Sequence, residues 1–426
     1  MNKYLKTLFA SLLLSIFAGD ALFAGNENAD NELPRFAVIS DIHFGSTGGD
    51  GAVVNVTRAL KHLLAKKPLD AIFVAGDLTN NGKPEQYDQL LSVFNDKTIV
   101  PETLPVYYLM GNHDNYTGAD AAIFFGNKLQ QPLNQFLTIK GYPFITLSQN
   151  GTGNNDYSAA TRSFLEEKMA EAAAKYPGKP IFVFMHIPPL NTCYGSWTHE
   201  GWGGDAFSSI LNKYPQAIVF SGHSHFPLGD PRSIHQNLFT AVNDGSVTYS
   251  EVEPKLLSEG IHPEGYKNIT EGVIVNLLAN GNVEMERWDT NRDEEITPRW
   301  IVEAPHDGSR FTYKNRNGLP APVFAPKAEV NVTKINAADS SCVVVFPQAS
   351  DNDVVHHYLV EILDKDKILA ENRTFSRFYL NSATPSSLRV KFSGLPPKRK
   401  LTARVTALDS YKNASVPVKS KKFQVK

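Results

Sequence analysis

Residues that can bind metal ions follow five separate apolar runs of this chain. They are Asp41, His43, Asp77, Asn112, His113, His186, His223 and His225. Carboxylate, imidazole and amide oxygen are borderline-to-hard ligands that suit Zn, Mn or Fe, and no cysteine joins them. One ion cannot bind so many ligands. If two ions share one of the carboxylates, the residues form a two-metal site with the ions ~3.5–4 Å apart, and this is the site that we predict. Such a pair can bind and deprotonate a bridging water and clamp a phosphoryl group, which predicts in-line hydrolysis of a phosphate ester.

The stretch Leu109-Met110-Gly111-Asn112-His113-Asp114 is the centre of this pattern. Its glycine allows a sharp turn at the carboxyl end of a strand, where open α/β sheets place their ligand chemistry. Asparagine, histidine and aspartate there can offer an oxygen ligand, a proton donor and a group to orient that donor. Taken alone, the same residues are typical of a polar turn. The four other apolar runs that end in the same way favour the chemical interpretation.

The elements that must position these residues are predicted to be buried strands with helices between them. Strands are expected over 35–40, 71–75, 105–110, 144–147, 180–185 and 217–221, and helices over 53–64, 84–94 and 159–174. Strand, helix and strand in succession predict a parallel pair with a right-handed crossover, which places Asp77 beside Asp41 and His43. Shorter alternating runs over 238–242, 272–278 and 283–288 predict antiparallel β structure that completes this domain.

The order Asp-x-His, Gly-Asp, Gly-Asn-His-Asp, His and Gly-His-x-His resembles the calcineurin-like metallophosphoesterase family over roughly residues 35–300. The resemblance implies a four-layer α/β/β/α sandwich. It implies that one ion is bound by Asp41, His43 and His225, that Asp77 bridges, and that the second ion is bound by Asn112, His186 and His223. His113 would protonate the leaving oxygen or stabilise developing charge, and Asp114 would orient His113 and hold its tautomer.

Residues 76–87 resemble the cyclic-nucleotide-phosphodiesterase-like branch of the family, which favours a diester substrate slightly. Purple acid phosphatases carry a tyrosine three residues after the bridging aspartate and no histidine in the first motif, whereas this chain has Asn80 and His43. The nucleotidase branch carries a larger, less purely β extra domain. A phosphomonoesterase remains one alternative. A catalytically silent metal-binding protein with an adhesion role is the other, although all ligand positions and His113 are present.

The segment 190–205 holds four ring-bearing residues among glycines: Tyr194, Trp197, His199 and Trp202. It follows His186 closely, so these rings are candidates to wall the substrate pocket and stack on a base or sugar. A surface loop tucked onto the domain is an equally good interpretation.

The last hundred residues lack helical periodicity. Short strands are expected over 330–335, 342–346, 357–363, 388–392, 401–407 and 423–425, which predicts an immunoglobulin-like β-sandwich over 327–426 after a linker at 315–326. The stretch from Gly394 to Asp409 resembles a fibronectin type III module, with Phe346 and Leu401 where that module has tryptophan and tyrosine. Such a tail can contact a protein or a glycan. The pair His356-His357 is expected at the surface, with rings on opposite sides of a strand.

The first 24 of the 426 residues have the layout of a secretory signal peptide, with Lys3 and Lys6 before the apolar run Leu8–Phe17 and small residues after it. This predicts an exported protein, periplasmic or secreted, whose mature chain begins with a linker at 25–34 before a domain at 35–314. The apolar run is too short to span a bilayer, and no second long run follows. Two cysteines in different predicted domains exclude a disulfide framework. A net charge of −2 gives no reason to expect a stable nucleic-acid partner.

Overall fold

The computed structural model describes residues 33–46, 51–118, 120–151, 156–258, 260–314, 319–336 and 338–425. The predicted signal peptide and nearly all of the predicted linker at 25–34 lie outside the described residues. None of the helices in these ranges is long and apolar enough to cross a membrane.

The first sheet has six strands in the order β12-β11-β10-β1-β2-β3. Their bounds are β1 Arg35–Ile39, β2 Ala71–Val74, β3 Val106–Tyr108, β10 Glu271–Leu277, β11 Val283–Asp289 and β12 Glu294–Val302. β1, β2 and β3 are parallel, so the predicted parallel pair is confirmed. β10, β11 and β12 extend the sheet in antiparallel register from the other side of β1, as the alternating runs predicted for β10 and β11.

The second sheet also has six strands, in the order β4-β5-β6-β7-β9-β8. They are β4 Asn134–Ile139, β5 Tyr142–Leu147, β6 Ile181–Phe184, β7 Ala217–Ser221, β8 Ile234–Gln236 and β9 Thr240–Asn243. The antiparallel prediction holds for β9 on one side alone: β9 pairs antiparallel with β8 but parallel with β7. Strand direction depends on how the chain crosses between β7 and β9, and the apolar run of β9 carries no sign of it.

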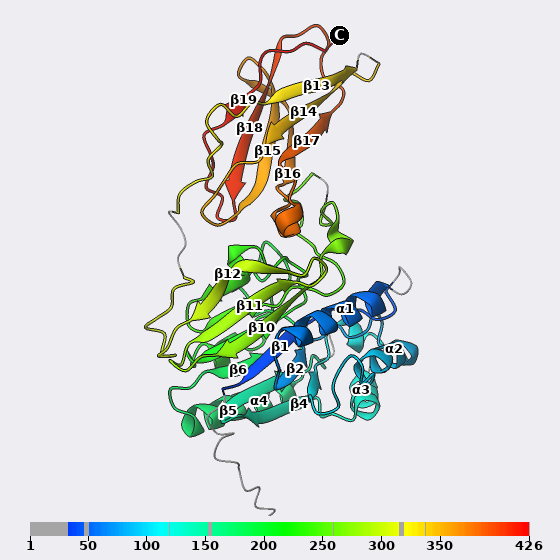
Figure 1. Ribbon diagram of the computed structural model, residues 1–426, viewed down its shortest axis with the longest axis vertical. Coiled ribbons are helices and arrows are strands. Elements are labelled where there is room, and N and C mark those ends of the chain that lie inside the picture. Colours follow the sequence, from blue (N-terminus) through cyan, green and yellow to red (C-terminus); the bar gives the residue numbers. More distant parts are fainter. Residues whose placement is uncertain are drawn as a thin grey trace, which may run out of the picture. The chain divides into compact units, whose positions relative to one another are not determined.

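Four layers result from the way each buried strand alternates its side chains (Figure 1). In β1, Phe36 and Val38 point to the core between the two sheets, and Ala37 and Ile39 point to the helices. Aromatic rings fill the space between the sheets, and the rings of Phe73 and Phe184 stack with their centroids 3.9 Å apart. Because both faces of the central strands are covered, β1, β2, β6 and β7 are almost entirely apolar.

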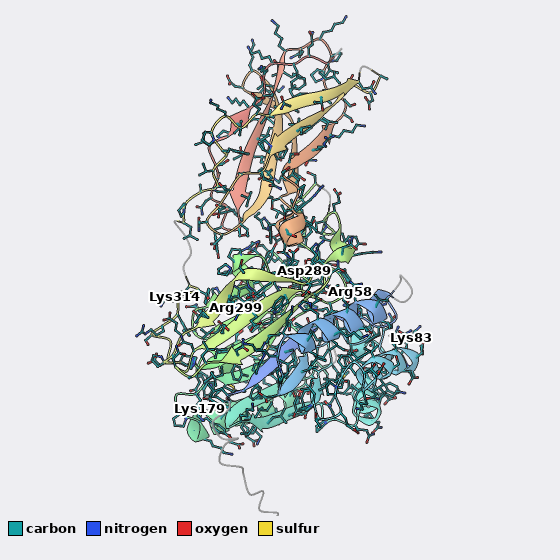
Figure 2. The ribbon with its side chains drawn as sticks, viewed as in Figure 1. Arg58, Lys83, Lys179, Asp289, Arg299 and Lys314 are labelled. Atoms are coloured by element: carbon teal, nitrogen blue, oxygen red, sulfur yellow. The ribbon has the colours of Figure 1, made fainter. Side chains whose placement is uncertain are left out.

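Helices cover the outer face of each sheet. α1 Gly51–Lys66, α2 Pro84–Phe94 and α3 Ala121–Leu129 pack on the first sheet, and α4 Ala159–Lys175 and α5 Ser208–Leu211 pack on the second. Charged residues such as Lys83 lie on the outside of these layers (Figure 2). Arg299, on β12, donates from Nε to Glu295 Oε1 at 2.5 Å. The predicted α/β/β/α sandwich is confirmed.

The tail folds into two small antiparallel sheets, β13-β14-β17 and β16-β15-β18-β19. Their strands are β13 Asn331–Asn336, β14 Ser341–Pro347, β15 Val355–Asp364, β16 Lys367–Phe375, β17 Ser387–Phe392, β18 Leu401–Asp409 and β19 Val418–Lys419. The all-β sandwich is confirmed. β16 escaped prediction because its sequence is largely polar, and the predicted strand at 423–425 forms only an isolated bridge from Phe423 to Leu401. Phe346 is buried in the core of this sandwich beside Tyr358.

The surface prediction for His356 and His357 was wrong. Both side chains are buried, and their Nδ1 atoms lie 3.0 Å apart. The pairing of β15 with β18 shifts register between Val355 and His357, so the strict alternation of sides that the prediction assumed does not hold there. His356 Nε2 reaches the hydroxyl of Tyr194 at 3.1 Å, so this histidine joins the sandwich to the loop after β6.

Candidate metal centre

The carboxyl ends of β1, β2, β3, β6 and β7 bring the sequence-predicted ligands together. Their side-chain donor atoms form two groups, each within 4.8 Å: Asp41, His43, Asp77 and His225, and Asp77, His186 and His223. Asp77 belongs to both groups. Asn112 joins the second, with its Oδ1 atom 3.1 Å from His186 Nε2. The strands come from two different sheets, so the site lies where the edges of the sheets meet.

The first group holds two imidazole nitrogens and two carboxylates at short range. His43 Nε2 lies 3.2 Å from His225 Nε2 and 3.6 Å from Asp77 Oδ2. His225 Nε2 lies 3.2 Å from Asp41 Oδ1. All four side chains are nearly inaccessible to solvent. Buried donors that converge in this way are the arrangement that a cation requires.

The second group shows a buried nitrogen without a partner. His223 Nε2 makes no hydrogen bond within the described part of the chain. His186 Nε2 lies 3.3 Å from Asp77 Oδ2. Because buried polar atoms are almost always satisfied, an orphaned imidazole nitrogen next to a carboxylate fits a metal ligand.

Backbone carbonyls set the tautomers of these rings. The Nδ1 atoms of His186 and His225 donate to the carbonyl oxygens of Ala75 and Tyr249 at 3.0 and 3.2 Å. A carbonyl can only accept, so each Nδ1 carries the hydrogen and Nε2 is turned to the site. Fixing a ligating imidazole through its second nitrogen in this way also makes it more basic.

The electrostatics of the site match a ligand set. Burial lowers the pKa of both His43 and His223 to about 3, so both rings are neutral. Burial raises the pKa of Asp41, but the neighbouring His225 outweighs it and lowers that pKa to about 2. Burial likewise opposes ionisation of His186, yet Asp77 raises its pKa to about 10. The raised pKa means that His186 keeps a proton on the side that faces Asp77, which is the place where a cation would bind.

The backbone at five ligand positions adopts a conformation that L-residues rarely take. The φ angles are 53° at Asp41, 41° at His43, 50° at Asp77, 70° at His223 and 57° at His225. Each such residue costs on the order of 1–3 kcal/mol and persists only where the surroundings enforce it. Their concentration in one small region is typical of a functional site.

Residues 34–227 match the model of the family described as calcineurin-like phosphoesterase. Over this stretch, a little under half of the chain, the protein is similar to calcineurin-like phosphoesterases. It is a metal-dependent hydrolase of phosphate esters, and its donor residues are arranged to hold a dimetal centre.

Relatives of this phosphoesterase include phosphodiesterases. A 3′,5′-cyclic-nucleotide phosphodiesterase of Nostoc sp. is 26% identical over 209 residues, which cover 46% of this chain and 73% of the relative. A glycerophosphodiester phosphodiesterase of Enterobacter lignolyticus is 27% identical over 215 residues, covering 44% and 70%. Among solved structures, purple acid phosphatase from yellow lupin seeds matches with a TM-score of 0.48 and 14% identity. That match covers 64% of this chain and about half, 54%, of the lupin protein.

Gly111 permits the close approach of the phosphoesterase's strand ends. A Cβ atom at this position would overlap Asp77 Oδ1 and lie 2.8 Å from His186 Cδ2. We therefore expect Gly111→Ala to weaken metal binding by about 10- to 100-fold, the usual effect of disturbing the groups that orient ligands. Titration of the metal-free protein with Mn²⁺ measures it. Gly51→Ala is the matched control because a Cβ there meets nothing within 4 Å, and equal affinities of the two variants would contradict the prediction.

Contrary to the prediction, the partners of the Asp114 carboxylate in the described part of the chain do not include the His113 ring. This carboxylate accepts hydrogen bonds from the backbone N–H groups of Leu78 (3.0 Å), Thr79 (2.9 Å) and Gly111 (2.9 Å). His113 Nδ1 instead lies 2.9 Å from the carbonyl oxygen of Asn80. Three backbone donors converge where Asp114 is buried, so the carboxylate holds the loop that carries Asn80 and orients His113 only through that loop.

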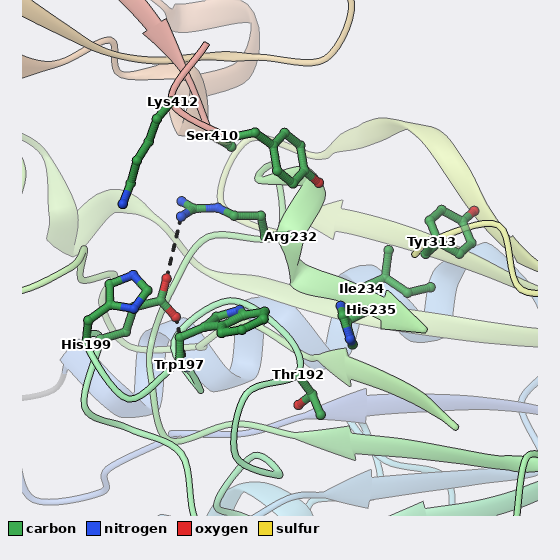
Figure 3. A pocket seen from close by; sticks show the side chains of 11 residues that line it. Thr192, Trp197, His199, Arg232, Ile234, His235, Tyr313, Ser410 and Lys412 are labelled. Atoms are coloured by element: carbon green, nitrogen blue, oxygen red, sulfur yellow. Dashed lines mark hydrogen bonds and ion pairs between the residues drawn. The ribbon is translucent and has the colours of Figure 1, made fainter. Parts of the chain in front are cut away.

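The four ring-bearing side chains of the segment 190–205 lie in three different places. Tyr194 is fully buried and donates to Glu253 Oε2 at 2.6 Å, so the prediction that it walls the substrate pocket was wrong. Trp197 and His199 line a cavity of about 360 Å³ together with Arg232 and the turn at 410–412 of the sandwich (Figure 3). Only Trp202 reaches the metal centre, with its ring centroid 5.2 Å from that of His223.

Other residues of the site were missed by sequence reasoning. The ring of Tyr249 lies 4.2 Å from that of His225, and the ring of Tyr116 lies 4.6 Å from that of His113. Ser40 donates to Asp41 and lies 2.5 Å from Asp244, which is buried. Tyr116 and Ser40 adjoin predicted motifs and could have been found by that nearness. Tyr249 and Asp244 follow their motif by about 20 residues in segments without a recognisable pattern.

Proposed function

We propose that this protein is an exported phosphodiesterase whose two metal ions share Asp77. The observation that carries the proposal is the position of one carboxylate oxygen, Asp77 Oδ2. It lies 3.6 Å from Nε2 of His43 in the first group and 3.3 Å from Nε2 of His186 in the second. A carboxylate placed between two sets of ligands is the feature that separates a two-metal site from two independent ones.

The two groups suggest how the ligands are divided. Asp41, His43 and His225 would hold one ion and Asn112, His186 and His223 the other, with Asp77 common to both. Mixed nitrogen and oxygen donors without sulfur fit Mn, Fe or Zn. When bound, such ions supply Lewis acidity, which polarises the phosphoryl group and makes a water molecule acidic enough to attack near neutral pH.

His113 is proposed to protonate the leaving oxygen. Its side chain is 26% exposed, whereas His43 and His186 are at most 1% exposed, so His113 is open to a substrate. Its Nε2 lies 3.9 Å from Asp77 Oδ2, at the edge of the ligand cluster, while Nδ1 is held by Asn80. With Nδ1 fixed, Nε2 of the imidazolium is the atom that gives up a proton.

A diester substrate is supported by the surroundings of the ligands. The rings of Tyr116, Trp202 and Tyr249 pack against metal ligands or His113 and bring no positive charge there, and Lys267 lines the cavity beside Tyr249. A phosphomonoester carries one more negative charge than a diester and would gain more from lysine or arginine there. The names of the Nostoc and Enterobacter relatives point in the same direction.

The preference is tested with bis-p-nitrophenyl phosphate and p-nitrophenyl phosphate on the mature, Mn-loaded chain. We expect kcat/KM for the diester to exceed that for the monoester, and Asn112→Ala to abolish both activities. Turnover of the monoester alone would replace the proposal with a phosphomonoesterase. Turnover of neither, with two ions bound, would favour a silent binding protein.

Export and the tail complete the proposal. Lys3, Lys6 and the apolar run after them support secretion or transfer to the periplasm. The tail's sheets of three and four strands are compatible with a fibronectin type III-like module. Val323 already pairs with Ser350 of this sandwich, within the proposed linker at 315–326. The same proposal includes two domains, at 35–314 and 327–426. It also includes a protein or glycan partner for the tail.

A further inference from the structure

A row of aromatic rings leads away from the metal centre on the side of His225. The ring centroids of His225 and Tyr249 are 4.2 Å apart, those of Tyr249 and His262 are 6.0 Å apart, and those of His262 and Tyr266 are 4.6 Å apart. We call Tyr249, His262 and Tyr266 the ring row. The ring row lines a cavity of about 390 Å³ that also includes Asn80, whose carbonyl holds His113.

The ring row is held in place by its own segment. His262 Nε2 lies 3.2 Å from Glu251 Oε1. The N–H of Ser250 donates to the carbonyl of Tyr266 at 3.1 Å, and that of Val252 to the carbonyl of Ile261 at 3.0 Å. These bonds hold 250–252 against 261–266, so the rings do not need to be ordered when a ligand binds. Such preorganisation lowers the entropic cost of binding.

The cavity offers both a stacking surface and polar groups. Planar rings bind the faces of other planar rings and tolerate any base, because every base has a π-face. Asn55 and Asn80 line the same cavity with amide groups that can donate and accept hydrogen bonds at a base edge. Lys267 lines it too, with its ammonium nitrogen 5.6 Å from the ring centroid of Tyr266. A glycerol substituent has no ring and would use none of the stacking surface.

We propose that the ring row binds the nucleobase of a nucleotide diester whose phosphoryl group lies at the metal centre. This deepens the proposed function and rests on it, because it names the substrate class of the same site. The other aromatic cavity, beside Trp197, is a weaker candidate. Its Arg232 is already paired with Asp230 at 2.9 Å and Glu253 at 3.0 Å.

The test compares two ligands that differ in the base alone, 5′-AMP and ribose 5-phosphate. Their binding to the mature, Mn-loaded protein is measured by calorimetry. We expect 5′-AMP to bind roughly 5- to 100-fold more tightly, the range that stacking of one base supplies. Tyr266→Leu should remove most of this difference and Tyr266→Phe should retain it, since phenylalanine preserves the ring. Trp197→Leu, in the other cavity, should leave the difference unchanged.

Equal affinities of the two ligands for the wild-type protein would overturn the inference, as would loss of the difference in Trp197→Leu but not in Tyr266→Leu. A Tyr266→Leu variant that melts like the wild type and still prefers 5′-AMP would also overturn it. Hydrolysis of bis-p-nitrophenyl phosphate by the same wild-type sample reports separately on the proposed function. If the diester is hydrolysed and the base preference is absent, only the ring row is wrong; if the preference is present without hydrolysis, only the phosphodiesterase proposal is wrong.

Discussion

Replacing Asp77 with asparagine is expected to lower kcat for a phosphodiester by about 10³-fold or more, since metal ions contribute several kcal/mol of transition-state stabilisation. The amide keeps the shape of the carboxylate but loses the negative charge that both ligand groups share. An amide has one oxygen, so it cannot both accept the hydrogen bond that Asp77 Oδ1 takes from the backbone N–H of His113 and place an oxygen where Oδ2 lies between the two ligand groups. Hydrolysis of bis-p-nitrophenyl phosphate at saturating Mn²⁺ measures the loss.

Asp244→Asn is the matched control for this substitution. Asp244 is another buried aspartate near the centre, and its side chain bonds to Ser40 rather than to a ligand histidine. Burial, reinforced by Asp41, raises its pKa well above the usual range, which favours the neutral carboxyl that an uncharged amide resembles. We expect this variant to lose less than about tenfold in kcat, below the usual effect of groups that bond ligands directly. Similar losses in both variants would show that any change at this buried edge disrupts the site.

Replacing His113 with alanine is expected to lower kcat by about 10²- to 10⁴-fold for a diester with an alkyl leaving group, the usual contribution of a general acid. For bis-p-nitrophenyl phosphate the loss should be much smaller, because p-nitrophenolate leaves without protonation. Comparing 3′,5′-cyclic AMP with bis-p-nitrophenyl phosphate measures the difference. Both ions should remain bound, since His113 belongs to neither ligand group.

His199→Ala provides the control for His113→Ala. His199 lines the cavity beside Trp197 and lies in neither ligand group, so its loss should leave both substrates unaffected. If His113→Ala slows both substrates equally and keeps its metal, the residue stabilises charge without transferring a proton. If it loses metal, its role is that of a ligand.

Much of the fold and the centre could be predicted because each ligand follows a continuous apolar run. The end of a buried parallel strand can be read from the sequence, because the apolar run stops there. Parallel strands bring their carboxyl ends to one edge of the sheet, so Asp41, His43 and Asp77 could be predicted to lie together. The apolar runs did not reveal that His186 and His223 come from a second sheet, because an apolar sequence does not determine which strands pair with each other. The family resemblance supplied that arrangement.

The residues around the ligands could not be predicted in the same way. Tyr194 and Trp202 stand in one glycine-rich loop, yet one is buried under the sandwich and the other lies beside His223. Such a loop has no period that fixes which side chain turns inward. Asp114 was expected to bond His113, but three backbone N–H groups bind it instead, and backbone donors leave no mark on the sequence.

The ratio of metal ions to protein chains tests the central claim most directly. Elemental analysis by mass spectrometry of the mature protein, purified and dialysed after exposure to Mn, Fe and Zn, should give two ions per chain for the wild type and at most one for Asp77→Asn. One ion or fewer in the wild type, or two retained in Asp77→Asn, would contradict a dimetal centre that shares this carboxylate.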